Sequence, residues 1–454
     1  MTTLIELIDA FTSGKATSLG AVEACLEEIG KRDNADAFVA VHADAAKKRA
    51  AEIDVARIDG KPLGRLVGVP VAIADNIAVS GEQMSCGSKI LETFRPPYTA
   101  TIVERLEAEG AIILGRTTLD EFGQNQPGKG AIAAVVNQCV PVAVTSDPIQ
   151  SLHITRFCGN KPDGQSPGVI GFEGTIGRIS RFGVTTIFPA LSRPGIIAQT
   201  TADAALMLDC LAGNDPNDAV SLAWETKTAS KKPKKVGVVA ELTQQLSGAK
   251  QKAEFEAFVK TLQSDGATVT EISMPHLRYA ARVFEVIAAC EASSSLVKFD
   301  GAHENKRVAE ADYAALRQKY GDWNWNEIGI VDQMYFFSRC EGLGYDSRLT
   351  STLGALFLNG EHFEKTFLKA AKLRRLIQND YLDAFKTVDL LVAPMFCNDN
   401  VTENATPANH TVASNTVASN LVAAIRLSGI PSVALKSQNA VLQAPQESEA
   451  ILIL

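Results

Sequence analysis

His153 and Cys158 carry the chemistry of a base and a nucleophile, and they lie five residues apart in the sequence. A cysteine thiolate attacks a carbonyl carbon when a neighbouring histidine takes its proton and a third group orients the imidazole ring. No orienting partner is evident beside this pair, and the spacing alone does not bring the two side chains face to face. We therefore expect Cys158 to be a buried structural thiol, with a Cys–His nucleophile as the alternative.

Residues 128–130, Gly-Lys-Gly, superficially resemble a phosphate-binding loop. They lack the spacing of the Walker motif, and no serine or threonine follows the lysine, so we expect a turn here. The chain has six histidines. They form neither an HExxH motif nor the paired His and Cys spacing of zinc sites. We therefore expect no metal site and no cofactor.

The elements that position such residues alternate between short apolar runs and helical patterns. Apolar runs at 66–74 and 111–115 enclose an amphipathic stretch at 101–109. Strand, helix and strand in this order predict a βαβ crossover, and so a parallel sheet covered by helices. Further strands are predicted at 140–144, 169–172, 235–239 and 388–394, and further helices at 4–30 with a break at 13–15, at 42–57, at 201–212 and at 253–264. The fold class is therefore α/β.

The length of 454 residues allows one large α/β domain or two to three average ones. A hydrophobic fraction of 46% is enough to bury a sizeable core. The Lys-rich segment at 228–235 is the best sub-domain boundary, but βα elements occur on both sides of it. We therefore predict a single domain over 1–454, with an N-terminal helical segment at about 1–60. The Asn- and Thr-rich residues 398–416 are typical of a long surface loop.

A net charge of −8 argues against a broad electrostatic contact with nucleic acid or with an anionic membrane. The N-terminus has no basic region followed by an apolar run, which argues against a signal peptide, and no apolar stretch is long enough to span a bilayer. The eight cysteines are scattered without a CxxC pair, as suits a reducing compartment. We expect a cytoplasmic protein that binds neither nucleic acid directly nor a membrane.

Several segments together resemble one protein family. Residues 66–76, with the sequence LVGVPVAIADN, resemble the strand and turn that carry the catalytic lysine of amidase-signature hydrolases. The closer resemblance is to the A subunit of the glutamyl-tRNA(Gln) and aspartyl-tRNA(Asn) amidotransferase. It is carried by residues 88–98, 119–122, 175–183, 274–276, 290–294, 299–301 and 338–344. The resemblance runs from residue 4 to about residue 435, with gaps. It implies the amidase-signature fold, a large mixed β-sheet sandwiched between helices (α/β/α).

The resemblance also implies a chemistry, hydrolysis of an amide C–N bond by a Ser-cisSer-Lys triad. A neutral lysine takes a proton, the middle serine relays it, and the last serine attacks the carbonyl, because a serine hydroxyl is a weak nucleophile without such a base. Glycine-flanked backbone N–H groups beside the nucleophile stabilise the oxyanion. The loss of one such donor typically costs about 3–4 kcal/mol of transition-state stabilisation.

Most of these functional positions are altered in this chain. The lysine position falls on Ala74, in a register fixed by the residues on both sides of it. The relay serine falls on Pro127, and no serine occurs between residues 89 and 145. The family's Ser-Asp-Thr-Gly-Gly-Ser corresponds to residues 146–151, SDPIQS. Ser151 therefore holds the nucleophile position, while Ile149 and Gln150 replace the two oxyanion-loop glycines and restrict the backbone more than glycine does.

Triad residues act as a unit, so the loss of one is nearly as damaging as the loss of all. We therefore expect a catalytically inactive or impaired protein in which Ser151 is an ordinary surface or turn serine. It would serve for binding or assembly within a complex, with partners that resemble the amidotransferase B or C subunits. The alternative is a remodelled amidase that hydrolyses a C–N amide bond with Ser151 as its nucleophile. The sequence names neither the ligand nor the pathway.

Overall fold

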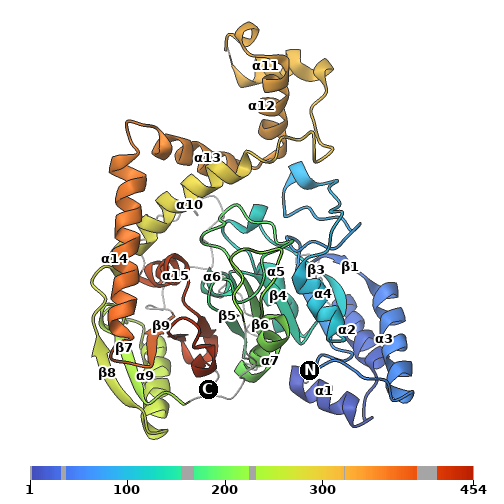
Figure 1. The fold of residues 1–454 in the computed structure, drawn as a ribbon, viewed down its shortest axis with the longest axis vertical. Helices are drawn as coiled ribbons and strands as arrows, with labels where there is room; N and C mark the ends of the chain where they lie inside the picture. The colour runs from blue at the N-terminus through green and yellow to red at the C-terminus, as the bar shows by residue number, and fades with distance from the viewer. Residues whose placement is uncertain are drawn as a thin grey trace.

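A computed structural model describes residues 3–31, 37–154, 168–223, 232–321, 323–395 and 417–452. Within these ranges eleven strands form one mixed sheet, in the order β1-β3-β2-β4-β6-β5-β10-β11-β9-β7-β8. The strands are β1 (Phe38–Val41), β2 (Pro70–Ala74), β3 (Ile112–Thr117), β4 (Val142–Ser146), β5 (Ile170–Glu173), β6 (Pro194–Ala198), β7 (Lys235–Val239), β8 (Thr268–Ile272), β9 (Leu390–Pro394), β10 (Ser432–Leu435) and β11 (Ala440–Gln443). Helices cover the sheet on both sides, which confirms the α/β/α prediction (Figure 1).

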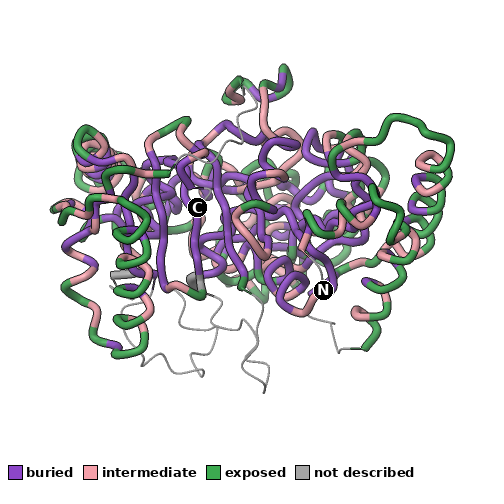
Figure 2. The backbone as a smooth tube through the Cα atoms, turned by 90° about the horizontal axis from the view of Figure 1, so that it is seen from below, coloured by how far each residue is buried: buried purple, intermediate pink, exposed green. Residues whose placement is uncertain are grey.

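The central strands are buried along their whole length. Every residue of β2, β4, β5, β6 and β9 is buried, as expected for near-continuous apolar runs covered on both faces. Strand β2 pairs in parallel with β3 and with β4, while β6 runs antiparallel to both β4 and β5. Figure 2 shows this buried core through the middle of the molecule, with exposed segments around its outside.

Six predicted helices are present close to their predicted bounds. They are α1 (Leu4–Thr12), α2 (Ser18–Lys31), α3 (Ala43–Ile58), α4 (Thr101–Ala108), α7 (Thr201–Leu211) and α9 (Ala249–Ser264). The break between α1 and α2 is confirmed. Thr3 begins α1 as a capping box with Glu6, and the Asp54 carboxylate accepts the backbone N–H groups of Ser18 and Leu19 at the start of α2.

Further helices lie where no helix was predicted. They are α5 (Lys129–Val136), α6 (Pro148–Ile154), α8 (Ala240–Thr243), α10 (Ala280–Leu296), α11 (Tyr313–Tyr320), α12 (Ile330–Gly342), α13 (Tyr345–Leu358), α14 (Lys369–Ala384) and α15 (Val417–Ser428). The turn expected at 128–130 is confirmed only at Gly128, because α5 begins at Lys129 and continues as an apolar, largely buried helix. None of the helices in the described ranges is long and apolar enough to cross a membrane.

Candidate active site

The carboxyl ends of β2 and β4 meet at one edge of the sheet, because these strands are parallel neighbours with Ile73 beside Val144. Ala74 is the last residue of β2, and Ser146 is the last residue of β4. Just beyond the two strand ends, the Asn76 Nδ2 donates a 2.8 Å hydrogen bond to the Ser146 Oγ. The candidate site is built around this junction.

Pro127 and Ser151 come to the same place from other segments. The Thr145 Oγ1 in β4 donates a 3.0 Å hydrogen bond to the Pro127 carbonyl. The next N–H group, that of Gly128, donates to the Ser151 Oγ at 2.6 Å. A Cβ on Gly128 would lie 2.9 Å from that oxygen, so this close approach requires glycine. The structure therefore brings Ala74, Pro127 and Ser151 together around the ends of β2 and β4.

Ser151 is fully buried in α6, so the expectation of a surface or turn serine is wrong. Its backbone N–H bonds the Asp147 carbonyl at 3.2 Å, and its Oγ donates to the same carbonyl at 3.3 Å. A serine hydroxyl has one hydrogen to donate. The Ser151 hydroxyl is thus engaged with backbone groups both as an acceptor, from Gly128, and as a donor, to Asp147.

The base and relay positions at the other end of the site carry no proton-accepting side chain. Ala74 is 1% exposed and presents a methyl group, and its register partner in β3 is Thr117. The lysines nearest to it in sequence, Lys61 and Lys89, are both exposed. Neither a methyl group nor the pyrrolidine ring of Pro127 accepts a proton. The positions that carry the base and the relay in the family's pattern are filled here by apolar side chains.

The two positions before Ser151 are held in α6 by fixed contacts. The Ile149 N–H donates to the Glu173 Oε1 at 3.0 Å. The Gln150 Nε2 donates to the carbonyls of Gln124 and Asn125 at 3.2 and 3.1 Å, and its Oε1 accepts from the Arg426 Nη1. The Gln150 carboxamide thus ties α6 both to the segment before Pro127 and to α15.

A buried ion pair anchors the start of α6. The Arg426 Nη2 donates to the Asp147 Oδ2 at 3.0 Å, and each side chain is 1% exposed. The Asp147 carboxylate also accepts hydrogen bonds from the Ser192 hydroxyl at 2.7 Å and from the Arg193 backbone N–H at 3.2 Å. Burial raises the pKa of the Asp147 carboxyl above its usual range, while the Arg426 charge opposes this rise. The Arg426 guanidinium also lies over the Phe284 ring, 4.6 Å from its centroid.

A second buried pair braces the other side of α6. The Arg193 Nε and Nη2 lie 2.8 and 2.7 Å from the Glu173 Oε2. The Glu173 carboxylate also accepts the hydrogen bond from the Ile149 N–H, so this residue contacts both Arg193 and α6. Buried charges are tolerated when paired, and the removal of one partner is strongly destabilising. The two pairs therefore fix α6 against β5, against the loop before β6, and against α15.

Sequence reasoning missed Glu173, Arg193 and Arg426. Glu173 and Arg426 share one signal, a charged residue at the end of an apolar run or inside it. Glu173 ends the strand sequence IGFE, and Arg426 interrupts the apolar helix sequence LVAAIRL. A buried charge of this kind requires an opposite charge, although the sequence does not say which one.

Two further expectations concern neighbouring residues. His153 lies within α6, but its side chain and the whole of Cys158 lie outside the described residues, so the Cys–His alternative stays a prediction. Across the described ranges, no group of three or more His, Cys, Asp and Glu side chains is arranged to hold a metal ion.

Comparison with known proteins gives a consistent result. A family model described as Amidase matches residues 20–138 and 166–445. The chain is 31% identical over 421 residues to the glutamyl-tRNA(Gln) amidotransferase A subunit of Protochlamydia amoebophila, covering 86% of this chain and 81% of that protein. It is 29% identical over 471 residues to the mitochondrial glutamyl-tRNA(Gln) amidotransferase A subunit of Ixodes scapularis, covering 95% and 88%.

Solved structures agree on the fold. A structure described as "An unexpected vestigial protein complex reveals the evolutionary origins of an s-triazine catabolic enzyme" superposes with a TM-score of 0.77 at 21% identity, covering 100% of this chain and 96% of that one. The glutamyl-tRNA(Gln) amidotransferase A subunit of Thermotoga maritima superposes with a TM-score of 0.69 at 21% identity, covering 100% and 93%. At these identities the likeness shows the fold alone.

Proposed function

The chain belongs to the amidase-signature family, and we propose that it is a catalytically inactive or impaired member, similar to the amidotransferase A subunit, that serves for binding or assembly within a complex. The observation that carries this proposal is the state of the Ser151 hydroxyl. Its oxygen accepts from the Gly128 N–H and its hydrogen is directed to the Asp147 carbonyl. Neither of these backbone partners is a general base that could remove its proton.

The surroundings of Ser151 support the same proposal. An oxyanion hole needs N–H groups that point to where the oxyanion will lie. The Ile149 N–H is instead committed to Glu173, and the Gln150 side chain occupies space next to the serine. Ser151 and Ile149 are 0% and 1% exposed, so an incoming amide would have to displace packed side chains.

The proposed partners follow from the relatives. Those proteins are named as the A subunit of the glutamyl-tRNA(Gln) amidotransferase, and one structural neighbour is described as part of a vestigial protein complex. We propose partners that resemble the amidotransferase B or C subunits. We also propose a cytosolic location, because six cysteines in the described ranges are free thiols, five of them buried.

Turnover of simple amides tests the proposal. Purified protein is incubated with glutamine and with acetamide, and ammonia release is compared with that of Ser151→Ala and of Ser264→Ala, which changes an exposed serine on α9. We expect all three proteins to match the uncatalysed rate. A remodelled amidase with Ser151 as its nucleophile would instead show turnover that Ser151→Ala abolishes and Ser264→Ala leaves intact, together with fluorophosphonate labelling of Ser151.

A further inference from the structure

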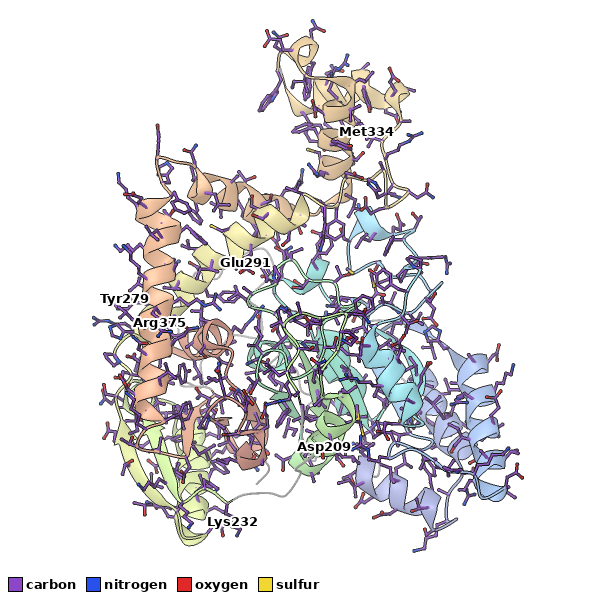
Figure 3. All side chains as sticks on the ribbon, in the orientation of Figure 1. Asp209, Lys232, Tyr279, Glu291, Met334 and Arg375 are labelled. Carbon is purple, nitrogen blue, oxygen red and sulfur yellow. The ribbon has the colours of Figure 1, made fainter. Side chains whose placement is uncertain are left out.

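Residues 310–321 and 323–342 form an arm that stands off the body of the molecule (Figure 1). The arm consists of the short 3-10 helices at Glu310–Asp312 and Trp325–Glu327 together with α11 and α12. Figure 3 labels Met334 on α12, at a distance from the central sheet. Figure 1 shows the arm apart from α6, and none of the site contacts described above involves it.

The arm has a small core of its own. Phe337 is fully buried, and its ring centroid lies 5.2 Å from that of Tyr313 and 5.1 Å from that of Trp325. The buried Gln333 carboxamide accepts from the Arg317 Nε at 2.9 Å and donates to the Trp325 carbonyl at 2.9 Å. Aromatic packing and these hydrogen bonds give the arm a defined shape. The arm therefore presents its outward residues from a defined backbone.

The outer face of the arm is apolar. Trp323 is 62% exposed, and Ile330 and Val331 are each 52% exposed. Phe336 adds a further ring that is 36% exposed. Helix α12 thus carries apolar residues toward the arm's core and also toward solvent, whereas a surface helix normally has one apolar stripe. The Trp323 and Phe336 ring centroids lie 6.4 Å apart, and exposed apolar side chains that cluster in this way mark interaction sites.

The charge beside this face is mainly negative. Glu310, Asp312 and Asp332 are exposed and form no ion pair among the described residues. Three nearby cations are engaged within the chain, while Arg307 is exposed. The Arg317 guanidinium donates to the Gln333 Oε1. The Lys319 Nζ lies 2.6 Å from the Glu341 carboxylate, and the Arg339 guanidinium donates to the backbone carbonyls of Val297 and Phe299.

We propose that this outer face docks a segment of another protein that carries aliphatic or aromatic side chains flanked by lysine or arginine. The apolar residues would be covered by the partner's apolar side chains, and its cations would pair with the free carboxylates. Nucleic acid and anionic membranes are disfavoured, because their phosphates would face these carboxylates. A second copy of the chain, with a net charge of −8, is disfavoured by the same repulsion. This inference rests on the proposed binding role.

The test uses the full chain and two synthetic amphipathic helical peptides of equal length, one of leucine and lysine and one of leucine and glutamate. The arm holds two of the chain's three tryptophans, Trp323 and Trp325, so intrinsic fluorescence reports its occupancy. We expect the lysine peptide to shift the emission with a saturable 1:1 titration, and the glutamate peptide to have no effect. Calorimetry supplies an affinity that does not depend on the fluorescence signal.

Substitutions in the arm test whether the lysine peptide binds there. We expect Val331→Ser and Asp332→Lys each to weaken binding of the lysine peptide about tenfold, equivalent to roughly 1.4 kcal/mol. Matched controls lie away from the arm. Val55→Ser changes a residue on α3 that is 56% exposed, and Glu104→Lys reverses an exposed charge on α4; both should leave the affinity unchanged.

Three results would overturn the inference. They are equal binding of the two peptides, no saturable binding, or weakening by the control variants as large as that by the arm variants. Dimerisation in sedimentation experiments that Val331→Ser abolishes would assign the face to a second copy and reject the basic partner. None of these measurements involves amide turnover. If the protein hydrolyses amides and the arm still binds the lysine peptide, the proposed inactivity is refuted and the inference about the arm stands.

Discussion

The Gly128 N–H donates a 2.6 Å hydrogen bond to the Ser151 Oγ, and this bond joins the segment at the relay position to the residue at the nucleophile position. In a triad these two segments would exchange a proton. Here the donor is a backbone amide, which gives up no proton, and the serine directs its own hydrogen to the Asp147 carbonyl. The contact has the character of a structural bond between two buried segments.

Ser151 should therefore contribute to stability. Ser151→Ala leaves the buried Gly128 N–H without an acceptor, and an unsatisfied buried donor costs about 1–3 kcal/mol. We expect the free energy of unfolding in urea to fall by that amount. Ser264→Ala, on the exposed side of α9, should change it by less than about 0.5 kcal/mol. Equal stability of the wild type and Ser151→Ala would show that the serine is not held as described.

The Asp147–Arg426 pair should dominate the stability of the site. Arg426→Met leaves a buried carboxylate unpaired, and we expect a loss of about 3–5 kcal/mol in chemical denaturation. Asp147→Asn in the same chain should recover part of this loss, because it removes the isolated charge. Arg375→Met is the control, since Arg375 is an exposed residue on α14 (Figure 3). Additive effects of the two site substitutions would contradict a direct ion pair.

Asp120 should make stability depend on pH. Burial raises the pKa of its carboxyl from 3.8 to about 6, although it accepts the N–H groups of Asn125 and Gln126 at 2.6 and 2.8 Å. A raised folded-state pKa means that ionisation opposes folding. The penalty is fully present above about pH 6 and declines as the pH falls toward 3.8, where the unfolded chain also takes up the proton.

Between pH 7 and pH 5 we therefore expect the wild type to gain about 1 kcal/mol relative to Asp120→Asn, which has no titrating group at this position. Urea midpoints measured at pH 5, 6 and 7 give this difference directly. Asp346 is the nearby acid that adds to the shift, so Asp346→Asn should reduce the effect without abolishing it. A difference between wild type and Asp120→Asn that stays constant with pH would contradict the raised pKa.

The buried thiols should be inert in the folded protein. Burial raises the pKa of Cys25 and of Cys210 to about 12, and that of Cys290 to about 11. Iodoacetamide at pH 7.5 with mass mapping should leave these three cysteines unmodified until urea is added. Rapid labelling of Cys158 under the same native conditions would revive the Cys–His alternative, whereas labelling of Cys25 would show that the core opens.

The sequence predicts the scaffold of the site better than the site itself. Strand β2 and the place of Ala74 at its end follow from an apolar run and a motif that the chain keeps. Helix α6 escapes prediction because it has seven residues and begins at a proline. The partner of Asp147 also escapes, because Arg426 lies 279 residues away and local patterns carry no information about such a pair.

Ammonia release from glutamine and acetamide, measured side by side for the wild type and Ser151→Ala, tests the central claim most directly. We expect both proteins to stay at the uncatalysed rate, while Ser151→Ala is less stable because it loses the bond to Gly128. Wild-type turnover that is well above this rate and that Ser151→Ala abolishes would show that Ser151 is a working nucleophile, and would contradict the proposal.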